Sequence, residues 1–236
     1  MSSAQLKSLA AYSACDVSDV LLKLNVPGAG FLADITPIPT STAIIKTIAK
    51  ASTFLFVPKS SGSFTQPPSA TPLQDLPEPN IKPGTPYADL ATADTVVVLS
   101  QPAGQKCAVM GGIMAVRMKK LGVKGVVVDG RVRDLGTCGE VGIPVWSKAT
   151  STIGAGAESK PWARDVPVVV GGVRVEAGDI IMIDPAENGV VSIPQSKLEE
   201  VLELLPKLVA ADENVIVDVE NGGTVADAFK EHRSNL

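Results

Sequence analysis

The feature that most constrains the fold is a strand, helix and strand pattern over residues 95–130. TVVVLS (95–100) predicts a short buried strand, and CAVMGGIMAVRMKKLG (107–122) predicts an amphipathic helix. VKGVVVDG (123–130) predicts a second buried strand. Because a helix commonly connects two parallel strands of one sheet, we predict an α/β fold with a βαβ core.

The amino-terminal part predicts helices followed by strands. Two helices are expected within the first 28 residues, the second capped by Asp16 or Ser18 and stopped near Gly28. Residues 43–57 carry β-branched residues in alternation and indicate two strands. Residues 58–90 are rich in Pro and Ser, so neither a regular helix nor a central strand can form there. We expect a long surface insert, with a lid over a site as the alternative.

The carboxy-terminal half predicts hairpins and then helices. The Gly-Gly pair at 171–172 and the Asn-Gly pair at 188–189 are typical of hairpin turns. Residues 195–236 have a helical pattern that is broken at Pro206 and at the glycine pair 222–223. We therefore expect the chain to end in a C-terminal helical tail.

Composition narrows the class of protein. The chain has 236 residues, of which 45% are apolar and 19% charged, so we expect one globular domain over 1–236. A net charge of −4 without a clustered basic surface argues against a nucleic-acid partner. With no long apolar run and no signal peptide, we expect no membrane partner and a cytoplasmic location. Three scattered cysteines without a CxxC motif suggest neither a zinc site nor a disulfide framework.

A cluster of charge follows the second strand of the core, in GVVVDGRVRDLG (125–136). Ligands of open α/β sheets collect beyond the carboxyl ends of parallel strands, where Arg133 and Asp134 are expected to lie. Arginine offers paired donors to a carboxylate or carbonyl oxygen, and aspartate offers a hard oxygen ligand for Mg²⁺ or Mn²⁺. The pair could hold a small anionic oxo acid. The alternative is a surface Arg–Asp pair that caps the next helix.

Two glycines lie in the preceding helix segment, in MGGIM (110–114). Gly111 and Gly112 would let a ligand approach the backbone, and free N–H groups at a helix N-terminus attract anions. Such a site requires the pair to lie in the first helical turn, whereas the pattern places the helix start near Cys107. The alternative is a close helix–sheet contact that needs small residues.

The stretch GGIMAVRMKKLGVKGVVVDGRVRD resembles the signature of the RraA-like proteins, which include the class II 4-hydroxy-4-methyl-2-oxoglutarate aldolases. In that signature a glycine is followed by about twenty residues and then Arg-Asp, as Gly112 is by Arg133 and Asp134. CDVSDVLLKLNVPG and GDIIMIDPAENGVVSIP are similar to further family segments, so the resemblance covers most of the chain outside 58–90. GRVRD and the Pro-rich insert resemble the fungal members most.

The resemblance implies a swivelling β/β/α fold and a homotrimer or dimer of trimers with active sites between subunits. It implies that Arg133 holds the C2 carbonyl oxygen of the substrate and that Asp134 anchors a divalent metal cation, Mg²⁺ or Mn²⁺. A carboxylate from the neighbouring subunit's C-terminal helix completes the family site, and Glu213 is the candidate here, with Asp212 second. The substrate carboxylate would be bound by the backbone N–H groups of Gly111, Gly112, Ile113 and Met114.

The implied activity is that of a metal-dependent lyase working through the enolate of pyruvate. Such an enzyme acts on a small 2-oxo acid, as a 4-hydroxy-4-methyl-2-oxoglutarate aldolase, an oxaloacetate decarboxylase or both. A positive partner at the developing enolate oxygen makes a lysine Schiff base unnecessary, although Lys119 and Lys148 are available. The alternative is a non-catalytic regulator, because the family takes its name from members that bind and inhibit an RNA-degrading enzyme.

One position departs from the family pattern. The family often has an acid three residues after the Asp of Arg-Asp, where this chain has Thr137. Glu140 follows three residues later. Either Glu140 replaces the family acid, or this chain functions without one. Arg131 is expected to be a solvated or interface charge that could compete with Arg133, Cys138 an inert thiol, and His232 a surface residue.

Overall fold

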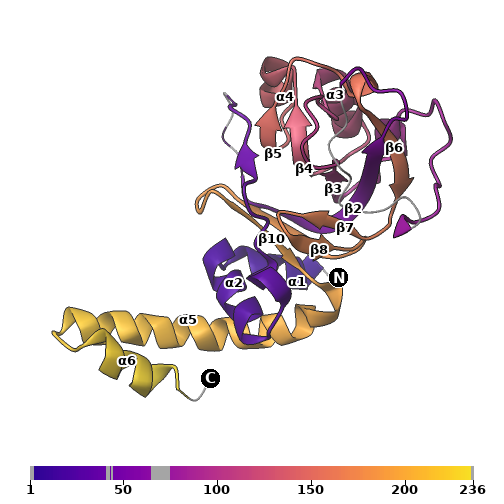
Figure 1. Ribbon diagram of the computed structural model, residues 1–236. Coiled ribbons are helices and arrows are strands. Elements are labelled where there is room, and N and C mark those ends of the chain that lie inside the picture. The colour runs from indigo at the N-terminus through magenta and orange to yellow at the C-terminus, as the bar shows by residue number, and fades with distance from the viewer. Residues whose placement is uncertain (1–2, 41–42, 44, 65–74, 235–236) are drawn as a thin grey trace.

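A mixed sheet of eight strands organises the computed structural model, which describes residues 3–40, 43, 45–64 and 75–234 (Figure 1). The strand order is β1-β5-β4-β3-β2-β9-β10, and β6 also pairs with β2. The sheet strands are β1 (Thr36–Pro37), β2 (Thr47–Pro58), β3 (Thr95–Ser100), β4 (Gly125–Val132), β5 (Val145–Thr150), β6 (Ser159–Arg164), β9 (Ile180–Asp184) and β10 (Gly189–Ile193). A separate hairpin joins β7 (Val168–Val170) to β8 (Val173–Val175).

The predicted βαβ core is present: β3 and β4 are parallel neighbours, and α3 (Gly112–Lys120) connects them. The predicted helix start near Cys107 is wrong. The segment before α3 is extended because it pairs with β4: Val109 N–H donates to the Arg131 carbonyl, and Arg133 N–H donates to the Met110 carbonyl. The glycine pair therefore lies at the very start of the helix, as the predicted anion site requires.

β2 is one strand where two were expected. Its residues carry no turn signal, and three neighbours pair along its length: β9 at its start, β3 in the middle and β6 at its end. A bulge between Leu55 and Phe56 changes its register against β6. One long strand thus joins the parallel part of the sheet to the antiparallel part.

Three apolar clusters surround the sheet. One lies under α3 and the short helix α4 (Leu135–Glu140) and contains Phe54, Met118 and Val128. A second contains Trp146 and the inward residues of the β7–β8 hairpin. In that hairpin Gly171 and Gly172 both have positive φ, of 56° and 86°, which confirms the predicted tight turn. The third cluster packs the amino-terminal helices and α5 against β9 and β10.

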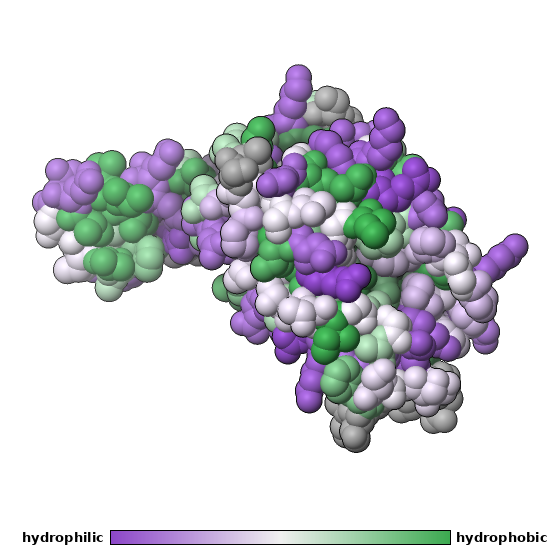
Figure 2. All heavy atoms as spheres, turned by 90° about the horizontal axis from the view of Figure 1, so that it is seen from above, coloured by the Kyte–Doolittle hydropathy of each residue, from purple (hydrophilic) through white to green (hydrophobic). Residues whose placement is uncertain are grey.

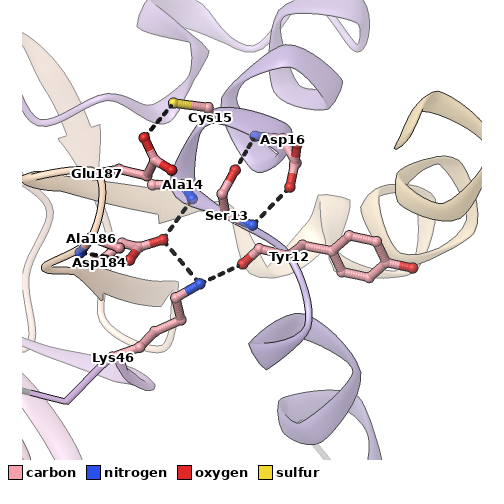
Figure 3. Close-up of polar contacts among 9 residues, drawn as sticks. All are labelled: Tyr12, Ser13, Ala14, Cys15, Asp16, Lys46, Asp184, Ala186 and Glu187. Carbon is pink, nitrogen blue, oxygen red and sulfur yellow. Dashed lines mark hydrogen bonds and ion pairs between the residues drawn. The ribbon is translucent and has the colours of Figure 1, made fainter. Parts of the chain in front are cut away.

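Of the amino-terminal helices α1 (Ser3–Ala10) and α2 (Ala14–Lys23), the start of α2 is fixed to the sheet by a buried carboxylate (Figure 3). Asp184 accepts from the Ala14 N–H at 2.9 Å and pairs with Lys46 at 3.0 Å. The N-cap of α2 is Ser13, not Asp16 or Ser18 as expected. Asp16 is instead the third helical residue and completes a capping box with Ser13.

The chain ends in an arm formed by α5 (Leu198–Glu220) and α6 (Val225–His232), which projects from the rest of the molecule (Figure 1). The predicted break at Pro206 is wrong, since α5 runs through it. The predicted break at the glycine pair is correct: Gly222, with φ of 90°, separates the two helices. Among the described helices, none combines the length and apolar composition of a membrane span.

The Pro-rich insert is only partly a surface segment. Its residues 65–74 lie outside the described part of the chain, and β2 already occupies position 58. Ile81, Tyr87 and Ala88 are buried in the cluster under α3. The prediction of a surface insert is therefore wrong for the part near residue 90, because these apolar side chains complete the core.

Candidate functional site

A pocket of about 200 Å³ lies where β4 ends and α3 begins. The extended segment 108–111 forms one wall, and Gly154 and Ala155 form an adjoining wall that a β-bridge between Ala108 and Gly154 joins to it. The lining residues are Tyr87, Ala108, Val109, Met110, Gly111, Ile113, Met114, Arg133, Asp134, Gly154 and Ala155. Parallel pairing of Met110 with Val132 places the glycine pair beside the charged end of β4, so residues 22 positions apart meet at one pocket.

Asp134 links the end of β4 to the start of α3. It lies in the left-handed region, with φ of 57°, and is the N-cap residue of α4. Its Oδ2 accepts a hydrogen bond from the Gly112 N–H at 3.1 Å and lies 3.7 Å from Arg133 Nε. Both side chains remain about half exposed, at 43% for Arg133 and 47% for Asp134. The alternative prediction is that the Arg–Asp pair only caps the next helix. Asp134 is the N-cap residue of α4, but its side chain makes no hydrogen bond to α4 and instead accepts one from α3.

A side chain at either of two glycines of the pocket would press on the Arg133–Asp134 pair. A Cβ at Gly111 would lie 2.7 Å from Asp134 Oδ2 and 3.1 Å from Arg133 Cγ. A Cβ at Gly154 would lie 3.2 Å from Arg133 Nη1. Gly111 has an extended backbone that any residue can adopt, so space and not conformation requires glycine there.

Most of the predicted site residues converge on this pocket. Gly111, Ile113, Met114, Arg133 and Asp134 line it, and the Gly112 N–H is bonded to Asp134. Ile113 is 76% exposed, so the rim of the pocket carries an unpaired apolar side chain. The first turn of α3 thus presents both backbone N–H groups and an apolar edge.

The predicted carboxylates of the C-terminal helix do not reach the pocket within one chain. Glu213 and Asp212 lie on the projecting arm, where Asp212 is bonded to Arg233 and Glu213 is exposed. Thr137 faces Gly112, whose Cβ would lie 2.8 Å from it. Glu140 is exposed at the end of α4 and is not among the residues that line the pocket.

Arg131, expected to be a solvated or interface charge that could compete with Arg133, is partly buried and is not among the residues that line the pocket. Its Nε donates to the Gln105 carbonyl at 3.0 Å, and its Nη1 donates to the Thr150 carbonyl at 2.9 Å. The β-bulge between Val128 and Arg131 shifts the register of β4 at this point. Arg131 therefore fixes neighbouring loops and leaves the pocket to Arg133.

The other candidate side chains lie outside the pocket. Lys148 pairs with Asp129 at 3.2 Å, and Lys119 donates to the Gly142 carbonyl at 3.1 Å. His232 is on the arm, 2.7 Å from Asp218. Cys138 is buried, and this burial, followed by the nearby charge of Asp134, raises the pKa of its thiol to about 11. A thiol that stays protonated fits the predicted inert role.

Sequence reasoning missed Tyr87 and the wall formed by Gly154 and Ala155. Tyr87 is 5% exposed, and its hydroxyl donates to the Val109 carbonyl at 3.1 Å. Burial raises the pKa of this phenol above its usual value, so Tyr87 remains a hydrogen-bond donor. Its ring packs edge-on against Phe54 and Phe56. No local pattern marks Tyr87 or Gly154, because only the folded chain brings them to the pocket.

The donor set of the pocket fits a hard divalent cation. Among the described residues that line it, Asp134 alone carries a carboxylate. Mg²⁺ is commonly held by one or two carboxylates while water and substrate oxygens fill its other positions. A half-exposed aspartate at the rim of an open pocket suits that mode, and the described residues of the lining include neither cysteine nor histidine, the side chains that typically hold Zn²⁺.

The chain belongs to the RraA-like family, described as Aldolase/RraA, whose profile matches residues 14–192. A protein of Halalkalibacterium halodurans named "Putative 4-hydroxy-4-methyl-2-oxoglutarate aldolase" is 32% identical over 123 residues, 52% of this chain and 57% of that protein. A Burkholderia multivorans protein of the same name is 36% identical over 101 residues, 41% of this chain and 57% of its own length. The chain thus matches little more than half of each of these relatives.

Solved structures confirm the α/β fold of this family. The Streptomyces coelicolor protein RraAS2, titled an unusual member of the RNase ES inhibitor RraA protein family, has a TM-score of 0.70 and 25% identity, with 90% of this chain and 96% of that chain covered. An uncharacterized protein from Pseudomonas syringae has a TM-score of 0.71 and 23% identity, with 97% and 98% covered. The latter likeness concerns the fold alone.

Proposed function

We propose that this protein is a divalent-metal-dependent lyase that works through the enolate of pyruvate. Its substrates would be small 2-oxo acids, cleaved as by a 4-hydroxy-4-methyl-2-oxoglutarate aldolase, decarboxylated as oxaloacetate, or both. The observation that carries the proposal is one pocket in which the Arg133 guanidinium, the Asp134 carboxylate and the N-terminus of α3 meet. The names of the relatives support the aldolase activity.

Each group has a role in this chemistry. The Ile113 and Met114 N–H groups in the first turn of α3 would bind the substrate carboxylate, because a helix N-terminus attracts anions and the Gly112 N–H is already bonded to Asp134. The Arg133 guanidinium would hold the C2 oxygen and stabilise the negative charge that develops on it. Asp134 would hold Mg²⁺ or Mn²⁺, whose charge would further stabilise the enolate. The Gly112 N–H keeps the Asp134 carboxylate turned toward the pocket.

The lining favours decarboxylation as the more robust reaction. Aldol cleavage requires removal of the proton from the C4 hydroxyl, and among the described lining residues Asp134 is the only carboxylate. Loss of carbon dioxide from oxaloacetate needs no such base. Efficient aldol cleavage would therefore require a further group, and Glu213 from a neighbouring subunit is our candidate.

We also propose a homotrimer or a dimer of trimers. Apolar side chains are exposed both at the rim of the pocket and on the arm, as Figure 2 shows for the end that carries α3 and α4 and for the projecting arm. Such surfaces commonly mark protein contacts. The exposed residues are Ile113 at the rim, Val116 on α3 and Leu135 on α4, and Ile216, Val217, Val219, Val225 and Phe229 on the arm. A cytoplasmic location is proposed as well, which the three free thiols support.

The decisive experiment measures pyruvate release from oxaloacetate and from 4-hydroxy-4-methyl-2-oxoglutarate, with Mg²⁺ and then with EDTA. We expect Asp134→Ala to lose activity by a factor on the order of 10²–10³. Asp94→Ala is a matched control, because Asp94 is also exposed and also has a positive φ, of 58°. Arg133→Lys should lose most activity, since an ammonium cannot reproduce a two-pronged contact. Activity that survives both EDTA and Asp134→Ala would contradict the metal-dependent mechanism.

The second candidate function is that of a non-catalytic regulator that binds an RNA-degrading enzyme. The likeness to RraAS2, whose title names an RNase inhibitor family, favours it. An RNase assay with this protein added would distinguish the two functions. Inhibition that is unchanged by Asp134→Ala, together with no pyruvate release, would support the regulator and overturn the lyase.

A further inference from the structure

We propose that Glu158 is a positioning residue for this site, because its buried carboxylate fixes the segment that leads into one wall of the pocket and reinforces the β-bridge that joins the two walls. The proposal rests on the proposed function for its catalytic consequence. Glu158 does not line the pocket and is not expected to touch the substrate. Its role would be to fix the wall formed by residues 108–111 relative to the wall formed by Gly154 and Ala155.

The contacts of Glu158 reach both walls. Its carboxylate Oε2 accepts hydrogen bonds from the Lys106 N–H at 2.6 Å and the Cys107 N–H at 2.7 Å, directly before the first wall. Its backbone follows the turn Ala155–Ala157, and its own N–H donates to the Ala155 carbonyl at 3.0 Å. Glu158 therefore adds to the hydrogen bond from the Ala108 N–H to the Ile153 carbonyl, at 2.7 Å, in connecting the segment that leads into the glycine pair with the segment that faces Arg133.

A network extends this connection to the end of β4. Gln105 Nε2 donates to the Glu158 carbonyl at 3.1 Å, and the Gln105 carbonyl accepts from Arg131 Nε at 3.0 Å. Gln101 Oε1 accepts from the Arg131 N–H at 2.8 Å. Arg131 lies two residues before Arg133. A displacement of the loop at Glu158 would therefore also displace the Arg133 guanidinium, which is expected to bind the substrate.

The burial of Glu158 has a cost that its contacts must offset. The residue is 1% exposed, and an unpaired buried carboxylate is strongly unfavourable. Two short bonds from backbone N–H groups provide the compensation, and they can form only while Lys106 and Cys107 keep their places. The buried carboxylate is therefore stable only while the segment that leads into the first wall keeps its observed position.

Asp179 provides a comparison within the same chain. It is also buried, at 7% exposed, and its carboxylate also accepts from two backbone N–H groups, Glu176 at 2.8 Å and Gln195 at 3.0 Å. Neither Asp179 nor its two donors line the pocket. If Glu158 served stability alone, removing either carboxylate would have the same consequences.

The experiment compares Glu158→Ala with Asp179→Ala in the full chain. Both should lower the Tm by similar amounts, but only Glu158→Ala should lower kcat for pyruvate release, by a factor of about ten or more, because small misplacements of catalytic groups are costly. Hydrogen exchange of the 106–112 backbone amides should accelerate in Glu158→Ala and not in Asp179→Ala. Glu158→Gln, which keeps an acceptor oxygen at the same reach, should restore most of both properties.

Each outcome decides the proposal. Equal kcat and equal amide exchange in the two alanine variants, or no rescue by glutamine, would overturn it. If Glu158→Ala does not fold, Glu158→Asp makes the same comparison, because it withdraws the carboxylate by one methylene group. If the wild-type protein releases no pyruvate, the proposed lyase function fails, while amide exchange still tests whether Glu158 fixes the wall.

Discussion

At the scale of single residues, Gly111 offers the sharpest test of the site. We expect Gly111→Ala to lower pyruvate release at least tenfold, because the added Cβ would lie 2.7 Å from Asp134 Oδ2 and displace the carboxylate or Arg133. Gly136→Ala in α4 is the control, since nothing lies within 4 Å of a Cβ there. Steady-state kinetics and thermal unfolding measure both variants. Wild-type kinetics in Gly111→Ala would mean that pyruvate release does not depend on the observed positions of Asp134 and Arg133.

A second residue-scale prediction concerns the thiol of Cys138. Burial raises its pKa from 9.0 to about 11, so the thiol stays almost entirely protonated at pH 8. Iodoacetamide at pH 8 should label the exposed Cys15 first and leave Cys138 unmodified with activity intact. Since the unfolded thiol ionises first, the free energy of unfolding should fall as pH rises from 9 to 11. Cys138→Ala should flatten that slope, and rapid labelling of Cys138 with loss of activity would contradict its inert role.

At the scale of elements, Pro206 is an exposed proline inside a long helix. Proline removes one N–H from the helix and crowds the carbonyl four residues earlier. We expect Pro206→Ala to raise the free energy of unfolding by about 1–3 kcal/mol, and Pro206→Gly to raise it less. Urea unfolding measures both. A fall in stability for Pro206→Ala would show that the packing of α5 depends on the proline.

Elements set by local pattern were the predictable ones. The apolar runs of β3 and β4 and the glycine turn of the β7–β8 hairpin follow from neighbouring residues alone. The start of α3 did not, because residues 107–110 have a helical apolar pattern but pair with β4 in the fold. The roles of Tyr87 and Glu158 were equally hidden, since their partners lie 22 and 51 positions away.

At the scale of the whole molecule, the site is built from one end of the sheet while the arm points elsewhere (Figure 1). The sequence predicted the pair Arg133 and Asp134 and the glycines that face them, because the apolar run of a strand precedes the pair and the glycines lie near the start of a predicted helix. It could not place Glu213, which lies on the arm and which we propose reaches the pocket of a neighbouring copy. The carboxylate that we assign to the site therefore has to be tested through assembly.

The last prediction concerns that assembly. If the arm of one copy covers the site of the next, Ile216→Asp and Phe229→Asp should reduce the mass in solution from a multiple of three chains to a single chain of 24.4 kDa. Both should also lose aldolase activity, because the Glu213 carboxylate would no longer reach a neighbouring pocket. Light scattering after size-exclusion chromatography measures the mass, and pyruvate release measures the activity.

Two further variants separate assembly from chemistry. Val169→Asp is the control, because Val169 is 57% exposed on the β7–β8 hairpin and should leave the mass unchanged. Glu213→Gln should leave the mass unchanged but lower aldolase activity, with a smaller effect on oxaloacetate decarboxylation, which needs no base at C4. A monomeric wild-type protein with full aldolase activity would contradict the shared site, since the described residues of one pocket supply no second carboxylate.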